Sequence, residues 1–385
     1  MLVPSFFEAQ AADLTPYLSG DAVKDYPNLA ALYTRSWKSM VINNKIYGVP
    51  IHLSPFFWWP FVHQELLDQA GVQHPKNGKE FKDMLVNVSK PPQVFGTASQ
   101  GGYNYAYDTI TGYYDAVFGA PNNWAVDANG KFVHEFETEQ FKASVAYATD
   151  LYKANLFHPD TASFNVQSAR NAFEARKVVH RFDGLTEQYW TLVGTPATAL
   201  PPPAPKVNML TPFAADGGKP IYHNGRASFG IAIIKKAPAE RVKLMLRVLN
   251  YMAAPFGSKE YLLMRYGAND SEFTFDAKGN PIQTDKGQLQ DQLPFVNIVR
   301  PADALYSSRD PGYAARIQGY QKVLAPIGVE DPTIGLYSNT QASKGVPVLQ
   351  KFGDAVSDIV AGRRPMSDFD GLVKDWRGSG GDTIR

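Results

Sequence analysis

The chain has 385 residues, a length that favours two lobes or domains over one compact domain. Its 38 Lys and Arg residues nearly balance its 37 Asp and Glu residues, which argues against a nucleic-acid-binding surface. Every 18-residue window contains polar residues, and the sequence has no cysteine. These two facts exclude a membrane span, disulfides, thiolate metal sites and a cysteine nucleophile.

Aromatic residues are abundant at 13%, whereas charged residues make up only 19%. Aromatic faces beyond the needs of a core suit sugar or aromatic ligands. The segment Met1–Glu8 has no features of a signal peptide, and the chain has no cysteine for lipidation. We therefore expect either a protein that stays inside the cell or a chain whose true beginning is missing.

The first half of the chain predicts helices, hairpins and one long loop. Asn43-Asn44 between two apolar runs indicates a hairpin over 41–51, and Asp127–Gly130 indicates a turn between short strands. Residues 96–120 are expected to form a strand and a loop followed by a short helix. Apolar spacing predicts helices over 30–37, 61–70, 80–88 and 137–154.

The second half continues the mixture of helices and strands. Ser168 is expected to cap a helix over 168–175, and a strand over 177–182 is expected to stop at Asp183-Gly184. Leu200–Pro205 is an extended, proline-rich segment. The remaining expectations are a strand at 228–234, a hairpin at 275–284, and helices at 238–253, 312–324, 348–361 and 372–376. The order predicts an α/β protein without internal repeats.

No catalytic or metal-binding motif is present. The seven histidines fall on separate segments without an i, i+4 pair, so we predict neither a metal nor a cofactor. The turns at Asp127 and Asp276 resemble the start of a calcium loop, but they lack its later oxygen ligands and read as hairpin turns. A glycosidase needs two carboxylates that flank the bond to be cleaved. A chain with 37 acidic residues always offers such a pair, so the presence of acidic residues does not indicate this activity.

Several aromatic side chains are candidates for stacking on a ligand. Trp58 and Trp59 are adjacent, and successive side chains of an extended segment point to opposite sides, so at least one is expected to face a cleft or a partner. For both residues packing and ligand binding remain open. Trp124 follows a Pro-Asn-Asn loop and is either a stacking ring or a hydrophobic plug. Asp183, Tyr189 and Trp190 combine hydrogen-bonding groups with rings directly after a strand, as sites for polyhydroxylated ligands do.

The chain resembles the extracellular solute-binding proteins, family 1, of ABC importers, in the lipoprotein branch for sugar uptake. The resemblance begins with Gly48-Val-Pro50, Glu65–Gly71 and Phe173–Lys177 followed by Phe182-Asp-Gly. It continues with Ala253–Ser258, Gly362–Pro365, Trp376 and Gly380-Gly-Asp. It covers nearly the whole chain and rests on the order and spacing of these motifs.

The resemblance implies an α/β, two-lobed, periplasmic-binding-protein-like (type II) fold that closes on its ligand like a hinge. Lobe one would hold residues 1–51 and 228–305, and lobe two residues 52–227 and 306–385. Family members begin with a signal, a lipidated cysteine and the first elements of lobe one. The resemblance therefore also implies that the first part of lobe one is missing here, and that the protein is extracellular or at the cell surface.

The sequence thus predicts the substrate-binding component of an ABC importer, which captures an oligosaccharide and passes it to permease subunits. We expect no enzymatic activity, no cofactor, no nucleic acid and no membrane span. The expected ligand-binding residues are Trp58, Trp59, Trp124, Asp183, Tyr189, Trp190 and Arg226. Two alternatives stay open: a carbohydrate-active enzyme with two essential acids, and a truncated remnant that binds nothing.

Overall fold

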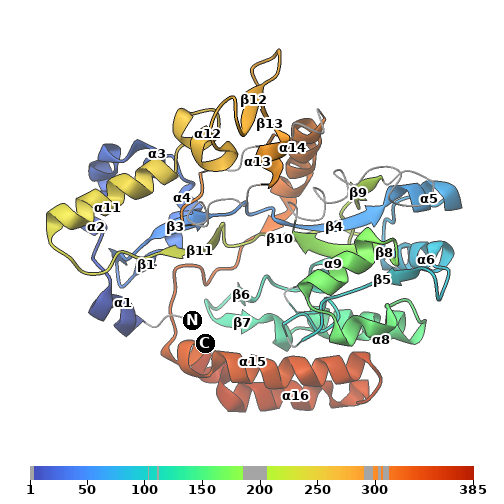
Figure 1. Ribbon diagram of the computed structural model, residues 1–385. Helices are drawn as coiled ribbons and strands as arrows, with labels where there is room; N and C mark the ends of the chain where they lie inside the picture. The colour runs from blue at the N-terminus through green and yellow to red at the C-terminus, as the bar shows by residue number, and fades with distance from the viewer. Residues whose placement is uncertain are drawn as a thin grey trace. The chain divides into compact units, whose positions relative to one another are not determined.

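The computed structural model describes residues 4–102, 104–110, 112–184, 206–289, 298–301, 305–306 and 312–385 (Figure 1). The chain divides into two compact units. Unit 1 comprises Met1–Pro55, Gly225–Gln318 and Thr333–Tyr337, and unit 2 comprises Phe56–Asn224, Gly319–Pro332 and Ser338–Arg385. The lobe boundaries expected at 51, 228 and 305 stay predictions.

Unit 1 is built around one antiparallel strand pair. β3 (Val49–His52) pairs with β11 (Ser228–Ala232), and Val49 lies opposite Ala232. Gly48 permits this pairing, because a Cβ atom there would lie only 2.3 Å from the Ile231 side chain. The helical elements of this unit are α1 (Pro4–Gln10), α2 (Thr15–Leu18), η1 (Gly20–Asp25), α3 (Pro27–Ala30), α4 (Thr34–Lys38), α11 (Ala239–Met252), α12 (Lys259–Tyr266) and α13 (Asp285–Leu289). Its hairpins are β1 (Val41–Ile42) with β2 (Lys45–Ile46), and β12 (Phe273–Phe275) with β13 (Pro281–Gln283).

The core of unit 1 lies between α11 and the early helices. Leu246 on α11 is completely buried together with Leu14, Leu29 and Val49. Apolar residues recur along α11 at helical spacing, so one side of this helix closes the core.

Unit 2 contains a four-stranded sheet in the order β5-β8-β4-β9. The strands are β5 (Phe95–Thr97), β8 (Val178–Gly184), β4 (Trp58–His63) and β9 (Val207–Met209). β5 and β8 run parallel, whereas β4 is antiparallel to both of its neighbours. Two further strand pairs are β6 (Trp124–Val126) with β7 (Phe132–His134), and β10 (Tyr222–His223) with β14 (Gly328–Val329).

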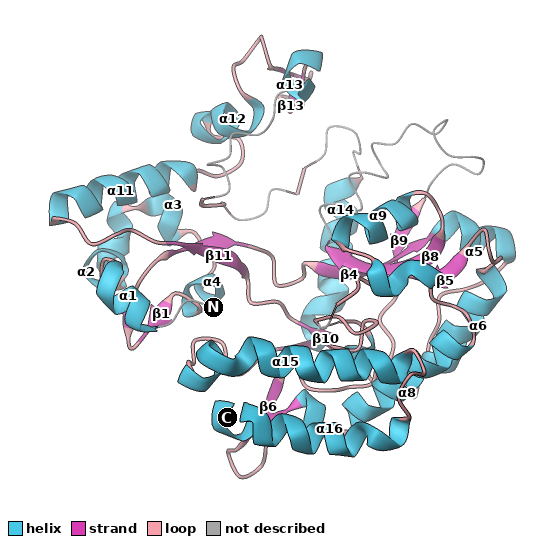
Figure 2. Ribbon diagram, turned by 60° about the horizontal axis from the view of Figure 1, so that its bottom comes forward, coloured by secondary structure: helices cyan, strands magenta, loops and turns pink. Residues whose placement is uncertain are grey.

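Helices cover the sheet of unit 2 and form a second layer beside it. They are α5 (Gln64–Ala70), α6 (Gly78–Val88), α7 (Tyr114–Val117), η2 (Glu135–Glu137), α8 (Glu139–Lys153), η3 (Pro159–Ser163), α9 (Val166–Glu174), η5 (Ala325–Ile327), α15 (Asn339–Val360), η6 (Met366–Asp368), α16 (Phe369–Trp376), η7 (Arg377–Gly381) and α17 (Asp382–Ile384), while α14 (Tyr313–Leu324) contains the break after Gln318. α15 and α16 lie side by side (Figure 2). Phe136 stacks on Phe352 of α15 with ring centroids 4.0 Å apart, which ties this layer to the core.

Most predicted elements are confirmed. Helices α6 and α8, the hairpins around Asn43-Asn44, Asp127 and Asp276, and the strand, loop and short helix over 96–120 all occur where the sequence pattern places them. Asn43 and Asn44 both have positive φ angles, of 49° and 61°, as a tight hairpin turn requires. The segment Leu200–Pro205 lies outside the described residues.

Five predictions differ from the structure. The helix expected over 30–37 is replaced by two short helices, because α3 ends at Ala30 and α4 begins at Thr34. Residues 61–63 belong to strand β4, because pairing with β8 and β9 on both sides outweighs an apolar pattern that suits either period. Asp183 and Gly184 continue strand β8 instead of stopping it. α9 is capped by Asn165, whose Oδ1 accepts from the amide of Ser168 at 2.8 Å, so Ser168 is the third residue of the helix. α15 starts at Asn339 and continues through Pro347.

Candidate ligand-binding site

One end of the unit 2 sheet brings polar and aromatic side chains together. β8 ends at Gly184 opposite Trp58, where β4 begins, and β5 ends at Thr97 opposite His180. Ligands of open α/β sheets commonly bind beyond the carboxyl ends of parallel strands. We therefore take this end, here called the β8 edge, as the candidate site. It is formed by Trp58, Arg170, Arg181, Asp183 and Gly184, with Ser99 and Asp108 of the loop that follows β5.

The two adjacent tryptophans of β4 have opposite surroundings. Trp59 is completely buried, donates its indole N–H to the backbone oxygen of Phe56, and meets the ring of Tyr320 edge-on at 5.1 Å. Trp58 is only half-buried and stacks on Phe182 with ring centroids 6.0 Å apart and an interplanar angle of 25°. The alternation expected of an extended segment is thus confirmed. Trp59 is a packing residue in this structure, and Trp58 is the tryptophan with a ring surface at the β8 edge.

Asp183 holds two arginines at this edge. Its two carboxylate oxygens accept hydrogen bonds from Nε and Nη2 of Arg170, both at 3.0 Å, from Nε of Arg181 at 2.8 Å, and from the amide of Gly184 at 2.6 Å. Burial opposes ionisation of Asp183, but the hydrogen bond from Arg170 and the charges of Arg181 and Arg170 lower its pKa below the usual value. Each oxygen already accepts two hydrogen bonds. Asp183 therefore orients the arginines, and its direct hydrogen bond to a ligand stays a prediction.

A second buried carboxyl group lies close behind the first. Asp108 is 3% exposed and accepts a hydrogen bond from the Ser99 hydroxyl at 2.7 Å. Burial raises the pKa of Asp108 to about 7, although the Ser99 hydrogen bond and the charge of Arg181 oppose this rise. At neutral pH this carboxyl group is therefore close to half protonated, so it contributes only part of a negative charge beside Arg181.

The backbone that carries Asp108 has an unusual conformation. Ala106, Tyr107 and Asp108 have φ angles of 39°, 60° and 63°, so three consecutive non-glycine residues adopt the left-handed region. Such a conformation costs about 1–2 kcal/mol per residue and persists only where the surroundings hold it. Here the Thr109 hydroxyl donates to Ala106 O at 2.8 Å, and the amides of Tyr113 and Tyr114 donate to Asp108 O. The turn thus fixes Asp108 toward Ser99.

The other predicted site residues lie elsewhere. Trp124 is 9% exposed and sits in the core against His134, with ring centroids 4.6 Å apart, and near Trp376 at 6.4 Å, so it is a hydrophobic plug in this structure. Arg226 is exposed and belongs to unit 1. Tyr189 and Trp190 lie outside the described residues. Of the predicted residues that the structure describes, Trp58, Trp59 and Asp183 lie at the β8 edge, with Trp58 on the opposite face of the sheet from the other two.

Sequence reasoning missed four residues of this edge: Ser99, Asp108, Arg170 and Arg181. One signal was available for Arg181, because it interrupts the apolar run Val178-Val179-His180 of a buried strand and has an acid two residues later. A buried charged side chain needs a partner of opposite charge. Residues two positions apart in a strand share one face, so Asp183 is placed to be the partner of Arg181. Arg170 and Asp108 gave no such signal in the sequence. Arg170 reaches Asp183 because α9 packs on β8, and Asp108 comes near Arg181 because of the path of the loop after β5.

The chemistry of the β8 edge is that of a binding site. Among the described residues, no group of three or more His, Asp or Glu side chains is arranged to hold a metal ion. The two carboxyl groups at the edge are buried against the arginines and Ser99. A half-exposed ring suits stacking of a ligand, and fixed guanidinium groups at the same end of the sheet, on its other face, suit hydrogen bonding.

Comparisons with known proteins point to one family. The family described as bacterial extracellular solute-binding protein matches residues 5–255, which is more than half of the chain. The polygalacturonan/rhamnogalacturonan-binding protein YtcQ of Bacillus subtilis (strain 168) is 21% identical over 381 residues, covering 95% of this chain and 74% of YtcQ.

Solved structures agree on the fold. The N-glycan transport solute-binding protein NgtS of Streptococcus pneumoniae superposes with a TM-score of 0.65 at 16% identity, over 100% of this chain and 83% of NgtS. The alginate-binding protein AlgQ2 gives a TM-score of 0.69 at 13% identity, over 98% of this chain and 80% of AlgQ2. The fold is thus the type II periplasmic-binding-protein fold predicted from the sequence. The chain belongs to the family of bacterial extracellular solute-binding proteins.

Proposed function

We propose that this protein is the carbohydrate-binding component of an ABC importer, which captures its ligand outside the cell and delivers it to permease subunits. The family consists of binding proteins of transporters, and the enzyme alternative finds no support in it. No helix among the described residues is long and apolar enough to cross a membrane.

The observation that carries the carbohydrate assignment is the half-exposed Trp58 ring at the same end of the sheet as the Arg170–Asp183 pair, which lies on the other face. An aromatic face packs against the C–H face of a sugar ring, and planar polar groups beside it bind the hydroxyl groups. The names of YtcQ, NgtS and AlgQ2 assign polysaccharides or glycans to these proteins, which supports the same class of ligand here. Of the other predicted residues, we retain Arg226 as a proposed contact because it is exposed, and Tyr189 and Trp190 stay predictions outside the described residues.

The proposal is tested by thermal unfolding of the full chain against a panel of mono- and oligosaccharides that includes oligogalacturonides. A ligand that binds only the folded state raises the unfolding midpoint in a concentration-dependent manner. We expect one class of saccharide to raise it. A cooperative transition that no saccharide shifts would contradict the carbohydrate assignment, and the lack of any cooperative transition would favour a non-binding remnant.

The contribution of the β8 edge is tested by Trp58→Ala with Trp37→Ala as the matched control. Trp37 is also a half-buried tryptophan, but it lies on α4 of unit 1 against that unit's core. We expect Trp58→Ala to weaken the binding of the active saccharide by about ten-fold or more, since a stacked ring contributes on the order of 1–3 kcal/mol. Equal losses in both variants would remove Trp58 from the proposed site.

A further inference from the structure

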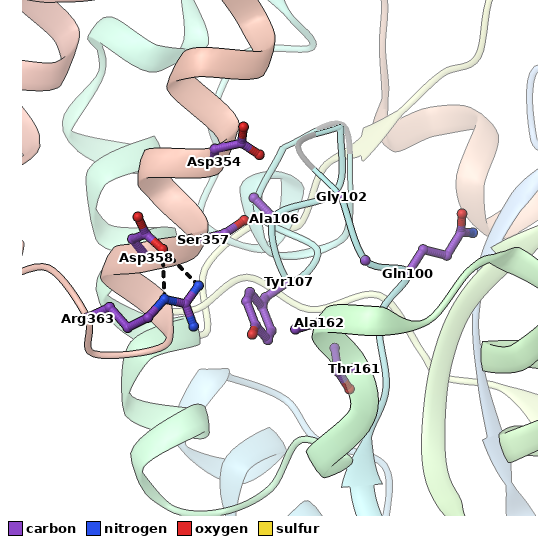
Figure 3. Close-up of a pocket in the computed structure, with 11 residues that line it drawn as sticks. Gln100, Gly102, Ala106, Tyr107, Thr161, Ala162, Asp354, Ser357, Asp358 and Arg363 are labelled. Carbon is purple, nitrogen blue, oxygen red and sulfur yellow. Dashed lines mark hydrogen bonds and ion pairs between the residues drawn. The ribbon is translucent and has the colours of Figure 1, made fainter.

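Two acidic residues of unit 2 are buried without a basic partner. Acidic side chains normally face solvent or pair with a base, and the pocket in Figure 3 contains one of each kind: Asp354 is exposed, and Asp358 accepts from Nε of Arg363 at 2.8 Å. In contrast, Asp115 on α7 and Glu135 in η2 are 0% and 1% exposed. Among the described residues, no Lys or Arg forms an ion pair with either acid, and Asp115 Oδ2 and both carboxyl oxygens of Glu135 have no hydrogen-bond partner. Such surroundings disfavour an ionised carboxylate.

The contacts of Asp115 assign its proton to one oxygen. Oδ1 accepts a hydrogen bond from the amide of Ala116 at 2.7 Å, and Oδ2 lies 3.6 Å from Nδ1 of His223. Nε2 of His223 lies 2.9 Å from Ala120 O, which can only accept a hydrogen bond. Nε2 therefore carries the hydrogen, and Nδ1 of the neutral ring presents a lone pair to Asp115. A proton on Asp115 Oδ2 turns the repulsion between these two acceptor atoms into an attraction.

Burial favours the neutral form of both partners. It lowers the pKa of His223 to about 4, although the hydrogen bond of the ring and the charge of Asp331 oppose this. Burial raises the pKa of Asp115 well above its usual value against the effect of backbone hydrogen bonds, and the charge of Asp108 raises it further. Burial also raises the pKa of Glu135, and the charges of Asp115 and Asp331 act in the same direction. The groups that face these acids are thus other acids and a neutral histidine.

The two acids lie beside a strand pair at which the chain leaves unit 2. β10 pairs in parallel with β14, and the amide of Asn224 donates to Val329 O at 3.0 Å. Nδ2 of Asn122 donates to both Asn224 O and Val329 O at 2.9 Å. Unit 2 is interrupted after Asn224 and again after Pro332. The pair β10–β14 therefore anchors two of the segments that continue from unit 2 into the rest of the chain.

Both acids are attached to this strand pair. His223, which faces Asp115, is the second residue of β10. The amide of Glu135 donates to the backbone oxygen of Asn123, which follows Asn122 in the chain, at 2.8 Å. A negative charge on either acid needs water or a cation, and water reaches these buried atoms only when the packing opens. Ionisation of the acids and opening of the strand pair are therefore coupled.

We propose that Asp115 and Glu135 form a pH-sensitive lock, which holds β10 against β14 while both acids are neutral and releases this strand pair when they ionise at alkaline pH. An acid that is protonated in the closed state and ionised in the open state raises the opening equilibrium by about ten-fold per pH unit. The lock lies within unit 2 and does not depend on the carbohydrate assignment of the β8 edge.

Infrared spectroscopy of the full chain tests the neutral state, because the carbonyl band of a protonated carboxyl group is distinct from the bands of a carboxylate. Asp115→Asn keeps the shape and the acceptor oxygen of the neutral acid, and its amide group can donate to Nδ1 of His223. We expect a protonated carboxyl band at pH 7 that this variant loses in part, and Glu135→Gln should give the same result independently. Loss of carboxylate bands instead, in both variants, would overturn the proposal.

Hydrogen exchange measured by NMR tests the release. The protection of the Asn224 amide, corrected for the intrinsic pH dependence of exchange, should fall by about ten-fold or more per pH unit above pH 7. The fall should vanish when Asp115→Asn and Glu135→Gln are combined, and Asp354→Asn, at an exposed acid, should leave it unchanged. The amide of Leu85, which is buried in α6, should stay better protected. Equal protection of Asn224 and Leu85 at every pH would show that the strand pair opens only with the whole unit, which overturns the lock.

Calcium distinguishes the lock from a cation site made of the same acids. Addition of calcium chloride to the full chain should change neither the thermal unfolding midpoint nor the protonated carboxyl band. A concentration-dependent rise of the midpoint with loss of that band would show that the acids are metal ligands, and it would overturn the proposal.

Discussion

Arg170 on α9 and Asp183 on β8 form a two-point ion pair in which Nε and Nη2 of the arginine lie 3.0 Å from different carboxylate oxygens. The pair is almost entirely removed from solvent, with the Arg170 side chain 16% exposed and Asp183 completely buried. Arg181 adds a second contact to the same carboxylate and is itself completely buried. Removing the acid would therefore leave two arginines without their shared partner.

Asp183→Asn is expected to lower the free energy of unfolding by about 3–5 kcal/mol, because it leaves buried positive charge uncompensated. Urea unfolding monitored by circular dichroism measures this. Asp83→Asn is the control, since Asp83 pairs with Lys79 at an exposed helix surface and should change stability by less than about 0.5 kcal/mol. Equal effects of the two variants would show that the buried network does not stabilise unit 2.

Asp108→Asn should change how stability depends on pH. The pKa of Asp108 is raised from 3.8 to about 7 in the folded protein, so the unfolded chain releases this proton first. The free energy of unfolding of the parent protein therefore falls as pH rises from about 4 to about 7. Asparagine has no proton to lose and lacks this fall, so the stability of the variant minus that of the parent should rise by up to about 4 kcal/mol between pH 4 and pH 8. Parallel pH profiles would contradict this.

His180 should contribute a loss of stability at acidic pH. Burial, with a smaller effect of the Arg181 charge, lowers the pKa of His180 from 6.5 to about 3. The unfolded chain therefore binds a proton first, and the stabilising contribution is present above pH 6.5 and lost as pH falls toward 3. His180→Gln should reduce the loss between pH 7 and pH 4 by about 3 kcal/mol. His74→Gln, at a more accessible histidine, should alter the profile less.

The neighbouring tryptophans should respond in opposite ways. Trp59→Ala removes a completely buried ring and should lower the free energy of unfolding by about 3–5 kcal/mol. Trp58→Ala should cost clearly less stability, because that ring is only half-buried. Saccharide affinity, measured where both variants are folded, should fall more for Trp58→Ala. The reverse ranking in either measurement would contradict the assignment of the two rings.

The sequence pattern predicts local structure well where one period dominates. α8 shows apolar residues at helical spacing over fifteen residues, and it is confirmed nearly to its ends. The helix prediction for the segment around Phe61 was wrong because its apolar residues fit a helix and a strand alike. Pairing with strands more than 100 residues later in the chain decides between the two. Such long-range pairing leaves no mark in a window of a dozen residues.

The candidate site was less predictable than the fold. The alternation of Trp58 and Trp59 follows from strand geometry, but which ring faces the core depends on Tyr320, far along the chain. Trp124 looks like a loop residue in sequence, yet the residues of β7 and Trp376 enclose it. The Arg170–Asp183 pair requires α9 to pack on β8, a tertiary contact that no local pattern encodes.

The saturated carboxylate of Asp183 has a consequence for binding kinetics and thermodynamics. A guanidinium that is held at two points retains little rotational freedom, so Arg170 keeps its orientation whether or not a ligand is present. Freezing a free arginine on binding would cost about 0.5–1.5 kcal/mol. At this edge that entropy is lost during folding, so a ligand of the proposed site would meet a prearranged surface.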